Sequence, residues 1–389
     1  MNQPTLQQTP PLSLYIHIPW CVRKCPYCDF NSHEAGNKVD ESAYIAALMS
    51  DLDQELIGNQ HREIKSIFFG GGTPSLFSAE SIDTIIEGVR SKASLTTDIE
   101  ITLEANPGTF EQEKFTDYRS AGVNRLSIGI QSFNDDRLHR LGRIHDSKEA
   151  IMAIESAYAA GFENINLDLM FGLPAQSVAE AIEDVEFACK LQPSHVSHYQ
   201  LTIESNTYFH KHTPVLPATD FIWDMQQHCH DTLNKHDYLQ YEVSAFSQAG
   251  KQCQHNMNYW TFGDYIGIGA GAHGKLTDIN KPSIQRRWKQ RQPAAYIKHA
   301  AGGNPCSGTS ELDQPDILFE FLLNALRLRH GFSYELFEQR TGINRQRLLE
   351  ACKNIDPELL VISETGLTTS PRGFDFLNDV LESFLVSKE

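Results

Sequence analysis

Short apolar segments alternate with amphipathic segments over the first 245 residues of the chain. Strands are expected at 12–18, 64–70, 99–105, 124–130, 164–170 and 195–201. Helices are expected between them at 40–58, 79–92, 111–120, 147–160 and 177–190. Strands that alternate with helices predict a parallel α/β sheet, because parallel neighbours need a long crossover connection. No G-x-G-x-x-G follows the first strand, so we expect a partial (β/α)6 TIM-like barrel rather than a Rossmann unit.

The character of the sequence changes after about residue 245. The stretch 251–275 is rich in Gly, His, Asn and aromatic residues, and GGNPCSGTS at 302–310 predicts a flexible linker. From residue 313, three helical segments, a hairpin (LLVIS, GLTTS) and a last helix predict a small winged-helix-like α+β domain. Four parts are therefore expected: a disordered lead-in at 1–10, a core barrel at 11–245, a motif-bearing region with a linker at 246–310, and the C-terminal domain at 311–389.

Charge and hydrophobicity narrow the classes of function. A formal net charge of −17 disfavours general binding to nucleic acid, because phosphates would be repelled. No apolar run approaches the ~20 residues that span a bilayer, so we do not expect an integral membrane protein. The start, MNQPTLQQTP, lacks the basic and apolar regions of a secretory signal, so we expect a cytoplasmic protein.

A DNA-linked regulator with Arg345 and Arg347 in a recognition-like helix is the alternative, and it predicts salt-dependent duplex binding.

Three of the eight cysteines are clustered in YIHIPWCVRKCPYCDF. Cys21, Cys25 and Cys28 are spaced C-x3-C-x2-C, whereas the other five stand alone. In a reduced compartment, clustered thiols indicate a metal site or catalysis more often than disulfides. Three thiolates can hold three corners of a [4Fe–4S] cluster and leave the fourth iron open to a small chelating molecule. The competing interpretation is a Cys3His zinc site with His17 or His33 as the fourth ligand, which leaves the rest of the chain unexplained.

This spacing, with an aromatic residue before the last cysteine, resembles the signature of the radical S-adenosylmethionine (SAM) superfamily. The resemblance implies that SAM binds the open iron and that an electron from the reduced cluster cleaves it. FFGGGTPS, after the second strand, is similar to the element that holds the SAM amino group in this family. Thr73 stands where the family has Glu, which is typical of the coproporphyrinogen-oxidase-like branch. The resemblance implies this SAM pocket: Tyr15, Tyr27, Gly71, Gly72, Thr73, Glu104, Gln131, Arg143 and Asp168.

Charged side chains inside a barrel are costly unless they are paired or meet a ligand. Glu104 and Asp168 can accept hydrogen bonds from ribose hydroxyls or an amino group, and Arg143 can pair with the SAM carboxylate. For each residue taken singly, a structural ion pair is the alternative.

HNMNYW, His255 to Trp260, matches the H-N-x-x-Y-W motif of the HemW heme chaperone family. An imidazole such as that of His255 can ligate heme iron, and Tyr259 and Trp260 offer aromatic faces to a porphyrin. Only 20 residues precede Cys21. The related oxygen-independent coproporphyrinogen III oxidase has a longer extension before its cluster. The basic segment RRWKQR at 286–291 is interpreted as a solvated face, with docking of carboxylates as the alternative.

The resemblance to the HemW family extends from Leu12 to about Phe384. It implies a heme chaperone that carries a [4Fe–4S] cluster and SAM, binds heme, and delivers it to acceptor hemoproteins, with respiratory enzymes at the membrane among the candidates. The alternative is an oxygen-independent coproporphyrinogen III oxidase, which decarboxylates two propionates. SAM-cleaving capacity is expected without coproporphyrinogen oxidase activity, so whether the chain is an enzyme stays open.

Overall fold

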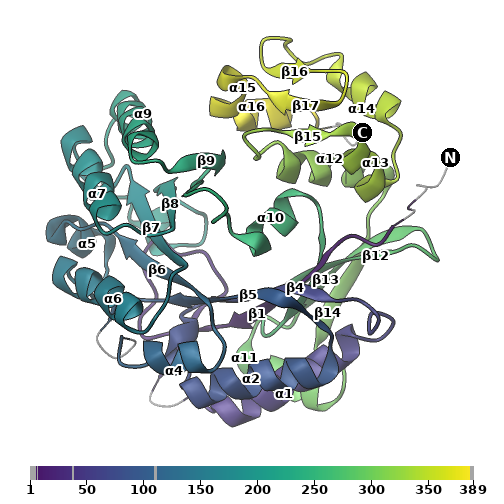
Figure 1. Cartoon of the computed structure of the whole chain (residues 1–389), viewed down its shortest axis with the longest axis horizontal. Coiled ribbons are helices and arrows are strands. Elements are labelled where there is room, and N and C mark those ends of the chain that lie inside the picture. Colours follow the sequence, from purple (N-terminus) through teal and green to yellow (C-terminus); the bar gives the residue numbers. More distant parts are fainter. Residues whose placement is uncertain (1–5, 7, 37–38, 109–111, 386–389) are drawn as a thin grey trace.

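The six expected parallel strands all form and lie side by side in one sheet (Figure 1). The computed structural model describes residues 6, 8–36, 39–108 and 112–385. The strands are β1 (Leu12–Ile18), β4 (Ile64–Gly71), β5 (Leu95–Ala105), β6 (Arg125–Gln131), β7 (Ile165–Phe171) and β8 (His195–Gln200). All five neighbouring pairs are parallel. The expected α/β fold with a partial barrel is therefore confirmed.

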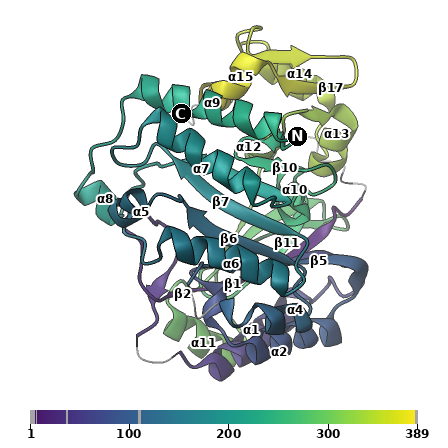
Figure 2. The ribbon, with the colours of Figure 1, turned by 60° about the vertical axis from the view of Figure 1, so that its left-hand side comes forward.

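Helices cover the outer face of the curved sheet (Figures 1 and 2). They are α1 (Glu41–Glu55), α2 (Ala79–Lys92), α4 (Phe115–Ser120), α5 (Asp135–Leu141), α6 (Ser147–Ala159) and α7 (Val178–Lys190). Asp146 and Ser177 begin α6 and α7 with capping boxes, which satisfy backbone N–H groups at the helix starts. The predicted helix at 111–120 is shorter in the structure, and its residue 111 lies outside the described residues.

The sheet continues beyond the barrel strands on both sides, to twelve strands in all among the described residues. Next to β1 lie β11 (Asp264–Ile268), β12 (His273–Asp278), β13 (Ser283–Lys289) and β14 (Cys306–Glu311), with α11 (Pro293–Ala301) between the last two. Next to β8 lie β10 (Ala245–Ser247) and β9 (Leu239–Glu242), which follow α8 (Tyr208–Lys211) and α9 (Thr219–Lys235). The expectation of a flexible linker at 302–310 is wrong for 306–310, because these residues pair with β13 through backbone hydrogen bonds.

The C-terminal domain combines helices with a three-stranded antiparallel sheet in the order β15-β17-β16. Its elements are α12 (Gln314–Ala325), β15 (Phe332–Ser333), α13 (Tyr334–Thr341), α14 (Arg345–Cys352), β16 (Leu360–Ile362), β17 (Gly366–Thr369), α15 (Pro371–Asp375) and α16 (Leu377–Glu382). This order agrees with the winged-helix-like expectation. The exact domain boundaries stay a prediction.

Two large apolar cores organise the described residues, one in the barrel and one in the C-terminal domain. Phe262 and Ile284, from the β11–β14 side, belong to the second core. Leu6 also belongs to it and is buried, so it is not part of a disordered lead-in, while residues 1–5 and 7 lie outside the described part. Across the described helices, none combines the length and apolar character that a membrane crossing requires.

Candidate functional site

The cysteine loop follows β1 and is fixed by a short parallel pair, β2 (Trp20–Cys21) with β3 (His33–Glu34). The Cys28 amide donates to the Cys25 carbonyl at 3.1 Å, which closes a tight turn between these two residues. Cys21, Cys25 and Cys28 are half-buried and line one cavity of about 520 Å³. Burial raises the pKa of the Cys21 and Cys28 thiols, so these thiols stay protonated until a metal displaces the proton.

The imidazole of His17, a candidate zinc ligand, is already engaged at both nitrogens. Its Nε2 lies 2.9 Å from the Asn31 carbonyl oxygen, and its Nδ1 lies 2.9 Å from the Tyr15 hydroxyl. Within the described ranges, no three His, Cys, Asp or Glu side chains converge closely enough to enclose a single ion. His33, the other candidate zinc ligand, is not among the residues that line the cysteine cavity. The three cysteines line a cavity with space beside them, which fits a multi-iron group with an exchangeable position.

The glycine loop at the end of β4 packs directly against the cysteine loop. The amide of Gly72 donates to the Ile18 carbonyl at 2.8 Å, and the amide of Thr73 donates to the Trp20 carbonyl at 2.7 Å. A Cβ on Gly72 would lie 2.5 Å from the Trp20 oxygen, so no larger residue fits. Gly71 has φ +116°, a conformation that favours glycine, and its amide donates to Glu104 Oε2 at 3.1 Å. The loop thus brings backbone next to the thiols.

Carboxylates from neighbouring strands face the same cavity. Glu104, near the end of β5, and Asp168, on β7, both line it. Burial, reinforced by the charge of Asp168, raises the pKa of Glu104 to about 8, and burial also raises the pKa of Asp168. Asp168 accepts from Asn166 Nδ2 at 2.8 Å and from the Ser127 hydroxyl at 3.3 Å. Both carboxyl groups are half-buried, and no arginine or lysine among the described residues donates a hydrogen bond to either. They can therefore accept from the amino group or hydroxyls of a ligand.

Arg143 lines this cavity, as Arg23 does, and lies beside the thiols. Its Nη1 is 3.4 Å from Cys25 Sγ, and its Nη2 donates to Asn106 Oδ1 at 2.9 Å and to the Gly129 carbonyl at 2.8 Å. The Nε is buried and has no hydrogen-bond partner among the described residues. A donor left over in this way suits an anionic group on a bound ligand, such as a carboxylate.

Eight of the nine residues expected to hold SAM line the cysteine cavity: Tyr27, Gly71, Gly72, Thr73, Glu104, Gln131, Arg143 and Asp168. Tyr15 does not, because it lines a larger, adjoining cavity to which Gly71 also contributes. Two further lining residues escaped sequence reasoning. Asn106 donates to Thr73 Oγ1 at 3.0 Å, and the Tyr199 hydroxyl donates to Gln131 Oε1 at 2.9 Å. Both come just after or within strands that face the cavity, which is the signal that could have identified them.

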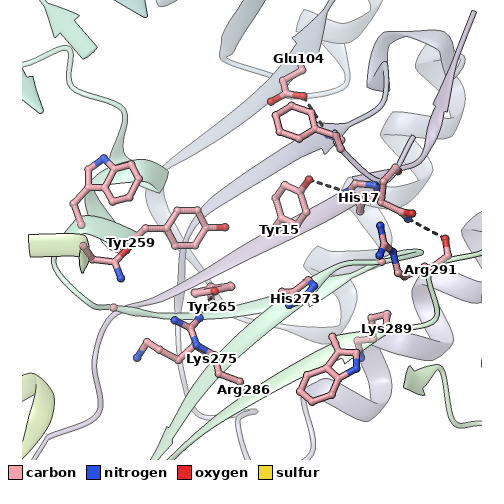
Figure 3. Close-up of a pocket in the computed structure, with 18 of the residues that line it drawn as sticks. Tyr15, His17, Glu104, Tyr259, Tyr265, His273, Lys275, Arg286, Lys289 and Arg291 are labelled. Atoms are coloured by element: carbon pink, nitrogen blue, oxygen red, sulfur yellow. Dashed lines mark hydrogen bonds between the residues drawn. The ribbon is translucent and has the colours of Figure 1, made fainter. Parts of the chain in front are cut away.

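A second, larger cavity of about 850 Å³ adjoins the first, and Phe30, Gly71 and Glu104 line both (Figure 3). Most of its polar wall comes from the sheet extension, β11 to β13. Its aromatic lining residues are Tyr15, Phe30, Tyr259, Trp260, Phe262, Tyr265 and Trp288. This size, with aromatic side chains and polar groups together in the lining, is typical of cavities that bind a small organic molecule.

The HNMNYW motif forms α10 (Gln254–Trp260), which lies on the concave side of the sheet (Figure 1). Tyr259 and Trp260 line the large cavity, but His255 is buried behind Tyr259. Both of its ring nitrogens are occupied, because Nδ1 is 2.9 Å from the Ser66 hydroxyl and Nε2 is 2.8 Å from the Tyr259 hydroxyl. Ser66 donates to Ser13, so its oxygen accepts from Nδ1–H, and Nε2 accepts from Tyr259. Burial lowers the pKa of His255 to about 3, so the ring is neutral.

The basic segment at 286–291 is mostly paired rather than solvated. Arg286 binds Glu320 and the Tyr265 hydroxyl, and Lys289 is buried against Asp51 and Glu55. Arg291 differs, since its guanidinium is exposed at the cavity and has no hydrogen bond or ion pair with another described residue.

Comparison with known proteins relates the chain to a defined family. Residues 15–188 match the family described as "Radical SAM superfamily", and residues 312–376 match "HemN C-terminal domain". The chain is 47% identical to "Heme chaperone HemW" of Escherichia coli, over 97% of this chain and 98% of the relative. It is 46% identical to "Heme chaperone HemW" of Haemophilus influenzae, over 98% of this chain and 100% of the relative. "Heme chaperone HemW" of Bacillus subtilis is 33% identical over 96% of this chain and 99% of its own length.

The structure of coproporphyrinogen III oxidase (HemN) from Escherichia coli superposes with a TM-score of 0.82. The superposition covers 97% of this chain and 90% of that chain at 20% sequence identity. At this identity, the likeness shows a shared fold and nothing about substrate.

Proposed function

Because the chain belongs to the HemW family of the radical SAM superfamily, we propose that it binds heme and passes it to acceptor hemoproteins. The observation that carries this proposal is the large aromatic cavity beside the cysteine cavity, since a macrocycle bound there lies next to the cluster site. Relatives named heme chaperones, similar over nearly their full length, support the same function. Delivery takes place in the cytoplasm, where the acceptors include respiratory enzymes at the membrane.

In this proposal Cys21, Cys25 and Cys28 hold a [4Fe–4S] cluster, and SAM occupies the rest of the cavity of about 520 Å³. When bound, the cluster supplies a low-potential electron to SAM. The chain's own residues position the cofactor: Arg143 meets the SAM carboxylate beside the thiols, and Glu104 and Asp168 accept from its amino group and ribose hydroxyls. The backbone of Gly71 and Gly72, close to the cysteine loop, borders the same space.

The HNMNYW motif contributes to heme binding as a unit. Tyr259 and Trp260 supply aromatic surface for the macrocycle, and His255 fixes Tyr259 through a hydrogen bond of 2.8 Å. Ligation of heme iron by His255 Nε2 requires the Tyr259 hydroxyl to leave that nitrogen first. A Tyr259→Phe variant, which lacks the hydroxyl, therefore removes this obstacle.

The function is tested by titrating heme into protein with a reconstituted cluster, under anaerobic conditions, and then adding an apo-hemoprotein acceptor. We expect saturable binding at one heme per chain and transfer of that heme to the acceptor. Absence of saturable heme binding in the wild-type protein would refute the proposal.

A second assay separates the chaperone from the related oxidase. The reconstituted protein is given SAM, a reductant and coproporphyrinogen III, and both protoporphyrinogen and 5′-deoxyadenosine are quantified. We expect no decarboxylated porphyrinogen. Stoichiometric decarboxylation would identify an oxidase instead.

A further inference from the structure

The large cavity offers a different imidazole from the one in the HNMNYW motif. Two histidines, His17 and His273, line the cavity, whereas His255 is buried behind Tyr259. His17 is occupied at both nitrogens by Tyr15 and Asn31. The imidazole of His273 is exposed and has no hydrogen bond or ion pair with any described residue. Of the three rings, it is the one whose nitrogen lone pair is available without breaking an existing contact.

The sheet extension directs His273 into the cavity. His273 is opposite Trp288 in the antiparallel β12–β13 pair, and Lys275 is opposite Arg286. Opposite residues in a sheet point to the same face, and so do residues two apart along a strand. One wall of the cavity therefore carries His273, Trp288 and Arg286 side by side, with the backbone of β12 and β13 behind them. Figure 3 shows His273 in the middle of this wall, with Tyr265 and Arg286 to one side and Arg291 to the other.

Trp288 can present a flat face next to His273 because of a glycine on β14. Gly308 is opposite Trp288 in the β13–β14 pair, and a Cβ on Gly308 would lie 2.3 Å from the indole. Any other residue there would push the ring away from the sheet. An aromatic plane beside an available imidazole is a suitable surround for a metalloporphyrin.

We propose that His273 is the axial ligand of heme iron in this cavity and that Arg291 pairs with a heme propionate. This inference rests on the proposed heme-binding function and assigns its iron ligand. Among the described cationic side chains that line the cavity, Arg291 is the one without a hydrogen-bond or ion-pair partner, whereas Arg286 is neutralised by Glu320. A guanidinium binds a carboxylate through two parallel hydrogen bonds, so it fixes one edge of the macrocycle. Partial burial of the ring, together with the neighbouring charges of Arg286 and Arg291, lowers the pKa of His273, which keeps the ring neutral and able to donate its lone pair.

The experiment is a heme titration of the full-length protein, followed by absorption and resonance Raman spectroscopy of the ferric and ferrous forms. His273→Ala is expected to lose the histidine-ligated spectrum and to bind heme about tenfold or more weakly. His273→Gly is expected to recover that spectrum when free imidazole is added, which a merely structural role would not produce. Arg291→Gln is expected to weaken binding severalfold without changing the axial ligand, because only the propionate contact is lost. His228→Ala, at an exposed position on α9 outside both cavities, is the matched control.

His255→Ala distinguishes the two histidines. We expect weaker heme binding, because Tyr259 loses its anchor, but an unchanged histidine-ligated spectrum. If His273→Ala keeps the wild-type spectrum and His255→Ala loses it, the assignment to His273 is overturned while the heme-binding function stands. If wild-type protein binds no heme at all, the proposed function fails first.

Discussion

At the scale of single residues, the three clustered cysteines differ from the five solitary ones by lining one cavity together, since partial exposure alone is shared by Cys306. Cys189, Cys229, Cys253 and Cys352 are buried, whereas Cys21, Cys25 and Cys28 are partly exposed and line a cavity. The sequence could identify this group because three thiols at C-x3-C-x2-C spacing have few structural explanations in a reduced compartment. It could not identify Asn106 or Tyr199, since a lone Asn or Tyr near a strand end has no distinctive spacing.

Cys21→Ser is expected to abolish cluster assembly, because two thiolates leave the cubane with too few protein ligands. Iron and acid-labile sulfide, measured after anaerobic reconstitution, should fall to near background. Cys306→Ser is the matched control, since Cys306 has similar exposure but lies on β14, outside the cysteine cavity. Equal iron and sulfide in the Cys21 variant and wild type would contradict the cluster assignment.

Glu104 should make the folding of the cluster-free protein depend on pH. Its pKa is about 8 in the folded state because it is buried near Asp168, against roughly 4.3 in an unfolded chain. Between these values the unfolded state releases the proton and the folded state keeps it, so the free energy of unfolding falls as pH rises. We expect this group to lower that free energy by more than about 1 kcal/mol between pH 5 and pH 8.

Glu104→Gln keeps an acceptor for the Gly71 amide but cannot ionise. Denaturant unfolding at several pH values should show a stability gain over wild type that is small near pH 5 and grows toward pH 8. Glu87→Gln, at an exposed position on α2, should show no such trend. A constant difference between Glu104→Gln and wild type across this range would mean that Glu104 is ionised throughout.

At the scale of elements, β1, β4, β6 and β7 could be predicted because each is a mostly buried run rich in apolar residues. Strands β5 and β8 are more polar and partly exposed, but they fit the same alternation of strands and helices. Strands β12 and β14 could not be predicted from the sequence. Their sequences, HGKLTD and CSGTSE, are polar and contain glycine, because their function is to pair with β13 and to make room beside the cavity. The HNMNYW motif was recognised, but its sequence does not reveal that His255 faces inward while Tyr259 faces the cavity.

The buried carboxylate of Glu100 fixes the start of α10, which is the element that carries the motif. It accepts from the Gln254 amide at 3.2 Å, the His255 amide at 3.1 Å and the Cys253 thiol at 3.6 Å. Glu100→Ala leaves these buried donors without an acceptor, so we expect a loss of about 2–4 kcal/mol in the free energy of unfolding. Chemical denaturation measures this loss, and heme binding should weaken with it because Tyr259 and Trp260 lie on the same helix.

Glu63→Ala is the control for this change, since Glu63 is an exposed carboxylate just before β4. It should stay within about 0.5 kcal/mol of wild type. If Glu100→Ala also stayed within that range, α10 would not depend on the carboxylate.

At the scale of the whole molecule, the barrel and the C-terminal domain share apolar contacts. Phe262 lies between the end of α10 and the start of β11, yet its ring packs edge-on against Phe321 of α12, with centroids 5.6 Å apart. Phe262 also lines the large cavity, and the ammonium of Lys275 lies 4.2 Å from the centre of its ring. One side chain thus connects the C-terminal core, the cavity and the sheet extension.

Phe262→Ala should therefore weaken both parts of the molecule together, by about 3–5 kcal/mol, the usual cost of removing a buried phenyl ring. Hydrogen exchange followed by mass spectrometry can resolve α12 from β11, and we expect faster exchange in both segments. Phe221→Ala is the matched control, because Phe221 is 58% exposed on α9 and should leave exchange in both unchanged. Faster exchange in α12 alone would mean that the C-terminal domain opens independently of the sheet. Faster exchange in both would mean that the cavity wall and the C-terminal domain form one cooperative unit, so that C-terminal contacts control how firmly the cavity holds its ligand.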